Sequence, residues 1–308
     1  MIGKIKGTGS YIPHREVDNY RLSLQIETSD EWIQERTGIK TRHLVDKEMT
    51  TAKMAIHAAK NAIAMAKVQV DTIDCILVST ISPNIILPCI ACEVQKEIGA
   101  TQATCFDLNA ACTGFLYAYN TAQAYIQAGI YKTILVIGAE TMSDLVDWED
   151  RNTCILFGDG AGAVVLQAEE DGMFYTYTRS SGEKGTALTC YPGKTIQMNG
   201  QEVFRFAIKQ VPDCIEKVLT RSSLKKSEVD FFILHQANKR IIEAVAKRLN
   251  VDIHKFPMNL QSYGNTSSAS IPILLDEWNR KGYFHAGMKM IMAGFGAGLS
   301  WGASFIEW

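Results

Sequence analysis

One cysteine of the chain stands where a reactive thiol is expected. Cys112 follows a strand-like run, residues 104–108, and the small residues Asn109-Ala-Ala111, and it precedes a segment that begins like a helix. The N-terminus of a helix favours the thiolate form, because the helix dipole and free N–H groups attract negative charge. The small neighbours leave room for a substrate beside the sulfur. We therefore predict that Cys112 is a nucleophile, although a buried structural cysteine could occupy the same position.

A histidine and an asparagine, both far from the thiol in the sequence, could complete its site. His235 ends a strand-like run, residues 231–234, and α/β folds place their sites at the carboxyl ends of strands. Asn265 lies in a segment rich in glycine and hydroxyl groups, residues 263–270, which leads into a helix. Taken alone, this asparagine could equally be a cap or turn residue. Together the thiol, imidazole and amide predict one site for nucleophilic catalysis.

Alternating strands and helices must position these three side chains. Short β-branched runs alternate with helical stretches, a pattern typical of an α/β fold with buried strands. The predicted strands are residues 75–79, 104–108, 133–137, 162–166, 231–234 and 289–293. The predicted helices are residues 51–67, 90–98, 113–128, 205–220, 239–249 and 268–281.

The chain also resembles itself in its two halves. Residues 70–79 resemble residues 226–235, and a glycine alternation precedes an apolar run in each half, at 158–162 and 294–298. Two matched features in the same order favour an internal duplication, while chance similarity between buried strands is the alternative. We expect the halves to be residues 1–170 and 171–308, meeting at a turn-like segment near residue 170.

Bulk composition excludes several classes of protein. Of 308 residues, 47% are hydrophobic and 21% charged, and the formal net charge is −2, without the basic excess that nucleic-acid binding needs. No apolar run approaches the roughly 20 residues that span a membrane, and no export signal is seen, so we expect a cytoplasmic protein. The eight cysteines lie in or beside apolar runs, as reduced buried cysteines do. Cys89 and Cys92 have metal-ligand spacing, but without a second pair they indicate helix residues and no metal site.

The sequence resembles the β-ketoacyl-acyl-carrier-protein synthase III family, which initiates type II fatty acid synthesis in bacteria. The matching segments are residues 28–39, 107–115 around Cys112, 235–238, 264–267 and 294–302, and the likeness runs from residue 1 to residue 308. Elongating synthases of the same superfamily carry two histidines with their cysteine, and thiolases carry a second cysteine late in the chain. Here the third member is Asn265, and no cysteine follows Cys214.

This resemblance implies a fold, a partner and a reaction. The fold would be the thiolase-like five-layered αβαβα arrangement of two similar halves, in a homodimer. Cys112 would take an acyl group from acyl-coenzyme A, with the oxyanion held by the N–H groups of Cys112 and Ala297. Malonyl-acyl-carrier protein would then lose carbon dioxide, and His235 and Asn265 would stabilise the resulting enolate. No metal or redox cofactor is implied.

The resemblance also assigns binding residues. Coenzyme A would be held at its adenine and phosphates by Thr28, Trp32, Arg36 and Arg151. The walls of its pantetheine tunnel would be Gly200, Val203, Phe204, Ala237, Asn238 and Ile241. The acidic carrier protein would meet the basic residues Arg205, Lys209, Arg240 and Lys247. Leu87 would line the acyl pocket where many relatives have phenylalanine, leaving room for starters larger than acetyl.

Three other functions remain open from the sequence. A relative in secondary metabolism, such as a specialised acyltransferase or priming ketosynthase, would share the three residues and differ in substrate. A hydroxymethylglutaryl-coenzyme A synthase would need a catalytic glutamate near residues 74–83, and that stretch has none. A catalytically dead scaffold subunit would have no reason to keep all three side chains.

Overall fold

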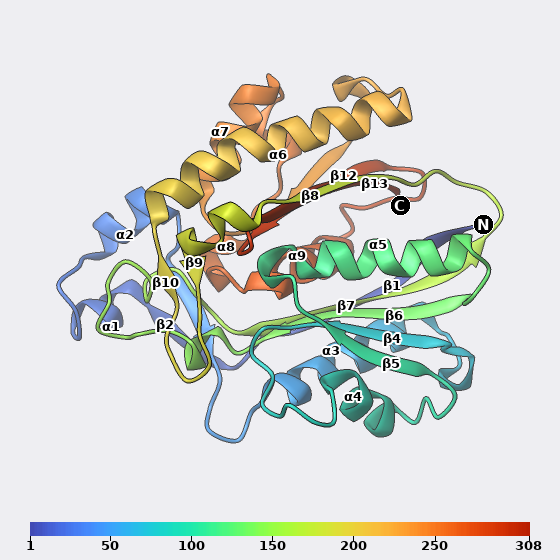
Figure 1. The fold of residues 1–308 in the computed structure, drawn as a ribbon, viewed down its shortest axis with the longest axis horizontal. Helices are drawn as coiled ribbons and strands as arrows, with labels where there is room; N and C mark the ends of the chain where they lie inside the picture. Colours follow the sequence, from blue (N-terminus) through green and yellow to red (C-terminus); the bar gives the residue numbers. More distant parts are fainter.

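Two β-sheets, each flanked by helices on both faces, make up the computed structural model, which describes residues 1–308 (Figure 1). The first sheet consists, in spatial order, of β1 (Ile2–Tyr11), β7 (Gly160–Glu169), β6 (Thr133–Glu140), β4 (Cys75–Ser79) and β5 (Thr104–Leu108). The second consists of β8 (Tyr175–Ser180), β13 (Ser300–Glu307), β12 (Lys289–Gly296) and β11 (Phe231–Leu234). β4, β6 and most of β7 are buried, as their apolar composition predicts.

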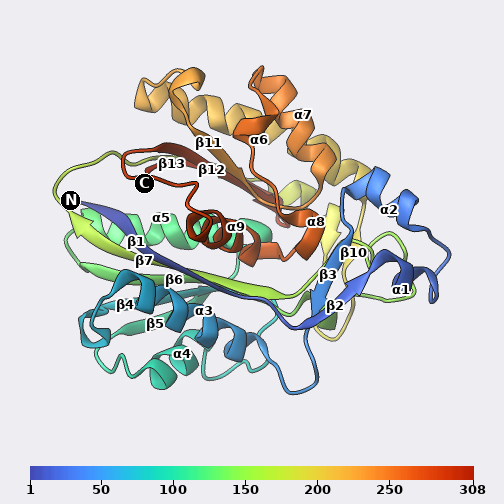
Figure 2. The ribbon, with the colours of Figure 1, turned by 180° about the vertical axis from the view of Figure 1, so that it is seen from behind.

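The helices complete five layers, which Figures 1 and 2 show from opposite sides. The outer face of the first sheet is covered by α3 (Thr51–Ala66) and α4 (Ile90–Ile98), and that of the second by α6 (Gly200–Ser222) and α7 (Lys239–Leu249). Between the sheets lie α5 (Gly114–Gln127) and α9 (Ser270–Arg280), which contact both. The expected αβαβα arrangement is therefore confirmed.

Smaller elements gather at one end of the layers. β2 (Arg15–Asp18) pairs with β3 (Thr41–Leu44), and β9 (Leu188–Thr189) pairs with β10 (Gln197–Met198). The short helices are α1 (Asn19–Ser23), α2 (Asp30–Thr37) and α8 (Leu260–Tyr263). No helix of the chain has the length and apolar character that crossing a membrane requires.

The two sheets repeat one topology. The order β1-β7-β6-β4 matches β8-β13-β12-β11, with the same parallel and antiparallel pairings. A hydrogen-bonding detail also recurs in both sheets. The aspartate before β4 accepts hydrogen bonds at the start of β6, and the aspartate before β11 accepts one at the start of β12. Asp74 Oδ2 accepts from the N–H groups of Lys132 and Thr133, and Asp230 Oδ2 accepts from Lys289 N–H. The two halves are therefore similar, and the proposed division at residue 170 falls between β7 and β8.

The glycine alternations predicted as equivalent occupy different places. Residues 158–162 lead into β7, whereas residues 294–298 end β12 and form the turn to β13. The sheets instead match the cross-strand pair Gly138–Gly162 with Gly294–Gly302. Each glycine run thus precedes one of the matched strands, β7 or β13, but the registers differ, because Gly162 corresponds to Gly302 rather than to Gly298.

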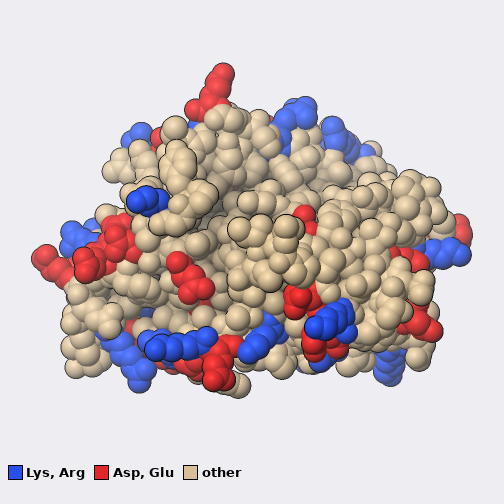
Figure 3. Space-filling model, turned by 60° about the horizontal axis from the view of Figure 1, so that its bottom comes forward, with Lys and Arg blue, Asp and Glu red and all other residues tan.

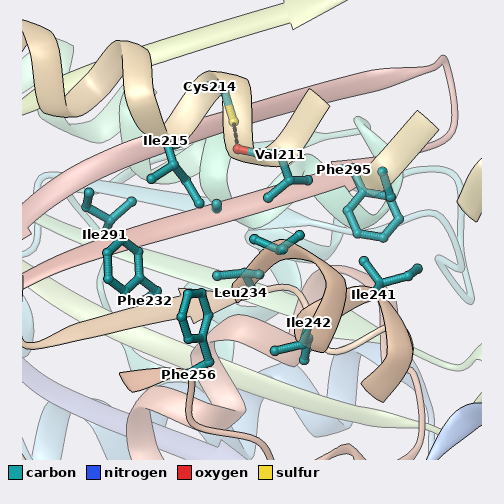
Figure 4. Packing of buried hydrophobic residues seen from close by; sticks show 14 of the residues in the cluster. Val211, Cys214, Ile215, Phe232, Leu234, Ile241, Ile242, Phe256, Ile291 and Phe295 are labelled. Carbon is teal, nitrogen blue, oxygen red and sulfur yellow. Dashed lines mark hydrogen bonds between the residues drawn. The ribbon is translucent and has the colours of Figure 1, made fainter. Parts of the chain in front are cut away.

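The second sheet carries the largest apolar cluster, part of which is drawn in Figure 4. Phe232 and Phe256 stack with their ring centroids 4.9 Å apart beneath α6 and α7. Pro212 lies inside α6 and has no N–H to donate to the Ile208 carbonyl one turn earlier. The Arg248 guanidinium from α7 donates to that carbonyl at 3.1 Å. This hydrogen bond links α7 to α6 at the point where the proline interrupts the backbone hydrogen bonds of α6.

Some predicted elements have the bounds seen in the structure, whereas others begin elsewhere or were not predicted. β4, β5, β11, α4 and α7 have the predicted bounds. α6 begins at Gly200, five positions before the predicted start, because the Asn199 side chain accepts from Glu202 N–H and caps it. β1, β8 and β13 were not predicted, since glycine and polar residues interrupt their apolar pattern.

Candidate active site

A cavity of about 760 Å³ brings the three predicted side chains together. Cys112 lies in the single 3₁₀ turn, Ala111–Thr113, that leads into α5. His235 follows the last residue of β11, and Asn265 lies between α8 and the 3₁₀ turn Ser267–Ala269. All three line the same cavity, so residues more than 150 positions apart in the sequence meet in one place.

The thiol of Cys112 is held in a strained and nearly closed setting. Ala111, directly before it, has a φ of 47°, in the left-handed region that residues with a side chain rarely adopt. Cys112 is only 9% exposed, and its Sγ lies 3.5 Å from Ser267 Oγ. Burial raises the pKa of the Cys112 thiol to about 12, which opposes the expected effect of the helix N-terminus. The resting group is therefore a thiol, and its proton must leave when it reacts.

The imidazole of His235 is buried and neutral. Its Nδ1 lies 2.6 Å from Ser270 Oγ, which also accepts a hydrogen bond from Gln236 N–H at 3.3 Å. In the tautomer that leaves a donor for a substrate, Ser270 Oγ donates its proton to Nδ1 and the imidazole proton lies on Nε2. Burial lowers the pKa of His235 to about 3. The side chain is thus a hydrogen-bond donor through Nε2 and a poor base.

The amide of Asn265 is oriented by its own loop. Its Oδ1 accepts from Ser267 N–H at 2.9 Å, and its backbone N–H and carbonyl pair with Leu156 and Gly158. With the oxygen occupied, the Nδ2 group is left to donate into the cavity, where Asn265 is 7% exposed. His235 and Asn265 therefore both present donors, which suits an anion rather than a cation.

The turn between β12 and β13 passes directly beside Cys112. A Cβ added to Gly296 would lie 2.9 Å from the backbone N of Cys112, so only glycine allows this approach. Ala297, the predicted second member of the oxyanion hole, is the next residue in that turn. The structure thus brings the Ala297 segment to Cys112, and the roles of the two N–H groups remain a prediction.

The other end of the cavity is lined by many of the residues predicted to bind coenzyme A. Lining residues from that prediction are Trp32, Arg36, Gly200, Val203, Phe204, Ala237, Asn238 and Ile241. Trp32 and Arg36 lie one turn apart on α2, and the Arg36 guanidinium carbon is 4.2 Å from the Trp32 ring centroid. Arg151 approaches the same ring at 5.4 Å, and the buried Thr28 hydroxyl has no partner in the chain.

The remaining predicted residues lie outside this cavity, with the exception of Arg240. Arg240 lines the cavity and is exposed, with its guanidinium 5.7 Å from the Phe204 ring. Arg205 and Lys209 share a separate hollow on α6, and Lys247 is exposed on the last turn of α7. Leu87 is 81% exposed and does not reach the thiol of its own chain.

Several residues of the site were not predicted individually. Ser267 and Ser270 contact Cys112 and His235, and both lie in the hydroxyl-rich segment that the sequence did indicate. Glu140, whose carboxyl contacts Ser267, ends β6 without any motif that could have identified it. Further lining residues missed by the sequence analysis are Thr37, Asn152, Ile155, Leu156, Phe157, Leu188, Met198, Asn199, Gln201, Phe295 and Gly296.

Comparison with known proteins gives a consistent result. Residues 106–182 match the family model of 3-oxoacyl-[acyl-carrier-protein] synthase III, and residues 219–308 match the model of its C-terminal part. A β-ketoacyl-[acyl-carrier-protein] synthase III of Clostridium novyi is 47% identical, over 99% of this chain and 98% of that protein. The crystal structure of 3-oxoacyl-[acyl-carrier-protein] synthase III from Aquifex aeolicus matches with a TM-score of 0.97 and 42% identity, over 99% of this chain and all of the other. The priming β-ketosynthase of the R1128 polyketide pathway matches with a TM-score of 0.94 and 33% identity, over 99% and 96%.

Proposed function

The chain belongs to the 3-oxoacyl-[acyl-carrier-protein] synthase III family, and we propose that Cys112, His235 and Asn265 carry out its reaction. The enzyme condenses an acyl-coenzyme A starter with malonyl-acyl-carrier protein, releasing coenzyme A and carbon dioxide, and thereby initiates bacterial fatty acid synthesis. The observation that carries the residue assignment is the meeting of a thiol and two hydrogen-bond donors in one cavity.

In the first half-reaction, the sulfur of Cys112 attacks the thioester carbon of acyl-coenzyme A. The carbonyl oxygen becomes negative, and the N–H groups of Cys112 and Ala297 stabilise it, which is why glycine at 296 must let the turn approach. The bond to the coenzyme A sulfur then breaks. The acyl group stays on Cys112, so one difficult step is divided into two.

In the second half-reaction, malonyl-acyl-carrier protein loses carbon dioxide and leaves an enolate. Nε2–H of the neutral His235 and Nδ2–H of Asn265 stabilise its oxygen, since both donors are fixed by partners behind them. The enolate carbon attacks the acyl group on Cys112, and the thiolate leaves. Both half-reactions proceed through polar bond changes, so we propose that no metal or redox cofactor takes part.

The cavity that contains Cys112, His235 and Asn265 suits the long pantetheine arm shared by coenzyme A and the carrier protein. Coenzyme A would lie with its adenine and phosphates against Trp32, Arg36 and Arg151, beside the unpartnered hydroxyl of Thr28. The acidic carrier protein would dock at the mouth of the cavity on Arg240, with Lys247, Arg205 and Lys209 as outlying charges.

A homodimer would explain the position of Leu87. Ile86 is 85% exposed and Leu87 is 81% exposed, in the loop before α4, and β5 beside it is an edge strand paired only with β4. Figure 3 brings this side of the molecule forward, and its middle carries few charged side chains. A face with few charges and an unpaired strand edge favours association with a second copy. We propose that Leu87 enters the acyl pocket of the partner subunit, where it leaves room for starters larger than acetyl.

The function in secondary metabolism is not favoured. The polyketide priming ketosynthase is 33% identical, less than the Clostridium and Aquifex initiating synthases at 47% and 42%. The test of the proposed function is an assay with malonyl-acyl-carrier protein and a panel of acyl-coenzyme A starters from acetyl to branched five-carbon groups. The 3-ketoacyl-acyl-carrier protein should form from at least one small starter. Acyl transfer to another acceptor with no loss of carbon dioxide would instead indicate a specialised acyltransferase.

A further inference from the structure

A buried carboxyl group behind the active site has no part in the mechanism described so far. Glu140 is the last residue of β6 and is 0% exposed. Its Oε2 accepts from the N–H of Ile81 at 3.0 Å and from the hydroxyls of Ser82 at 2.7 Å and Thr80 at 3.2 Å. Its Oε1 accepts from the hydroxyls of Ser268 at 2.8 Å and Ser267 at 3.1 Å. All these partners are uncharged, so no cation explains why an acid is buried here.

The carboxyl group is connected to the nucleophile through one hydroxyl. Ser267 Oγ lies 3.5 Å from Cys112 Sγ on one side and 3.1 Å from Glu140 Oε1 on the other. Ser267 has a φ of 50°, a strained value that the surrounding contacts must maintain. Gly138 helps, because a Cβ there would lie 2.4 Å from the Ser268 carbonyl oxygen and push this turn away from β6.

Acylation needs a group that accepts the thiol proton. Burial raises the pKa of Cys112 to about 12 and lowers that of His235 to about 3, so transfer from this thiol to this imidazole is strongly unfavourable. Burial also raises the pKa of Glu140, which makes its carboxylate a better proton acceptor than an exposed one. The titratable side chain that Glu140 faces is Cys112 itself.

We propose that Glu140 accepts the proton of Cys112 through Ser267 during acylation and returns it after condensation. This inference rests on the proposed function, because it requires Cys112 to be the nucleophile. Ser267 would act directly on the reacting sulfur, and Glu140 would act through Ser267.

The protons balance over the cycle. As the bond from sulfur to the acyl carbon forms, the thiol proton moves to Ser267 Oγ, and the hydroxyl proton of Ser267 moves to Glu140. Coenzyme A leaves as its thiolate and takes a proton from water. When the enolate carbon displaces the Cys112 thiolate, the proton returns from Glu140 through Ser267, and the thiol and carboxylate are restored.

The hydrogen-bond network can hold Glu140 in either protonation state. Ser268 Oγ lies 2.8 Å from Glu140 Oε1 and 3.0 Å from the Ser79 carbonyl oxygen, but it has only one proton to donate. With Glu140 ionised, Ser268 donates to the carboxylate. With Glu140 protonated, the acid donates to Ser268, which then donates to Ser79. Ser268 and Glu140 therefore stay hydrogen-bonded to each other in both protonation states.

The test measures single-turnover acylation by acetyl-coenzyme A across a pH series in four proteins. These are the wild type, Glu140→Gln, Ser267→Ala and the control Asp159→Asn, each checked for folding by thermal unfolding. Asp159 is also buried and accepts from Ser143 and Val45, but no hydroxyl connects it to Cys112. Glu140→Gln and Ser267→Ala should acylate about 10²-fold or more slowly, the usual effect of losing a proton acceptor.

The pH profile separates proton transfer from a structural role. In the wild type and in Asp159→Asn the acylation rate should rise through an inflection as Glu140 ionises, and Glu140→Gln should lose that inflection. An unchanged rate, or a slower rate with the inflection preserved, would overturn the relay. Ser267→Ala decides the matter if Glu140→Gln does not fold. If the wild type itself gains no acyl group on Cys112, the proposed function fails rather than the relay alone.

Discussion

Ser270 Oγ lies 2.6 Å from Nδ1 of His235, on the first residue of the helix that packs between the two sheets. This contact leaves Nε2 as the nitrogen available to a substrate. It also explains how a buried imidazole can act without gaining charge, because a neutral ring already donates one hydrogen bond. The account of His235 as an enolate stabiliser depends on this arrangement.

The two donor side chains should separate the half-reactions. His235→Ala and Asn265→Ala should each lower malonyl decarboxylation by about 10²–10³, the usual cost of one lost donor to an oxyanion. Transfer of acetyl from coenzyme A to Cys112 should fall much less, because neither side chain takes part in it. Rapid-quench measurements of both half-reactions in folded variants check this, and an equal loss in both would contradict the assignment.

Unfolding at mildly acidic pH should reveal the buried, neutral state of His235. Its pKa is lowered to about 3 in the folded chain, whereas an unfolded histidine has a pKa of about 6.5. Below pH 6.5 the unfolded state binds a proton that the folded state does not, so stability is complete above that pH and falls toward pH 3. At pH 5 the protonation of this histidine in the unfolded state should lower the free energy of unfolding by roughly 2 kcal/mol.

Urea titrations at pH 7 and pH 5 measure this contribution. The loss of stability between the two values should be smaller in His235→Gln than in the wild type. His254→Gln, at an exposed histidine, should leave the loss unchanged. Identical losses in all three proteins would show that His235 is protonated as easily in the folded chain as in the unfolded one.

The sequence could predict the three central residues because each lies at a strand or loop end beside a helix. Cys112 and His235 each carried a signal in their local pattern, whereas Asn265 gained meaning only together with them. Ser267 and Ser270 lay within the indicated hydroxyl-rich segment, but their partners depend on how two sheets face each other. The sequence could not identify Glu140 as a residue of the site. It is simply the last residue of an apolar strand, and its role depends on hydroxyl groups that the fold brings around it.

The fold, like the site, could be predicted only where the local sequence pattern is clear. Strands buried on both faces, such as β4, had continuous apolar runs and could be located. β8, with the sequence Tyr-Thr-Tyr-Thr-Arg-Ser, has polar residues at alternate positions, and the one strand it pairs with, β13, is far away in the chain. Pairing of that kind follows from the repeated topology rather than from local composition.

Charge reversal at the cavity mouth should impair the carrier protein selectively. Arg240→Glu places a negative charge against an acidic partner, so the KM for malonyl-acyl-carrier protein should rise, and its salt dependence should weaken. Acylation by acetyl-coenzyme A should change little. Lys60→Glu is the control, because Lys60 is exposed on α3, on the side of the molecule opposite α7 (Figure 1). If Arg240→Glu leaves the KM and its salt dependence unchanged, the carrier protein docks elsewhere.

Enlarging Leu87 should narrow the choice of starter. If Leu87 enters the partner's acyl pocket, Leu87→Phe should lower kcat/KM for isobutyryl-coenzyme A by about tenfold or more relative to acetyl-coenzyme A. Ile86→Phe, at the neighbouring exposed position, should leave this ratio unchanged. Equal ratios in the wild type and Leu87→Phe would place the end of the acyl pocket away from this loop.

Covalent labelling of Cys112 tests the central claim most directly. The enzyme is incubated with radiolabelled acetyl-coenzyme A, part is digested for mass spectrometry, and the rest is chased with malonyl-acyl-carrier protein. We predict one acetyl group on Cys112, its transfer into 3-ketoacyl-acyl-carrier protein during the chase, and no label in Cys112→Ala. Condensation by Cys112→Ala at the wild-type rate, or an acetyl group on another residue that is chased into product, would contradict the account.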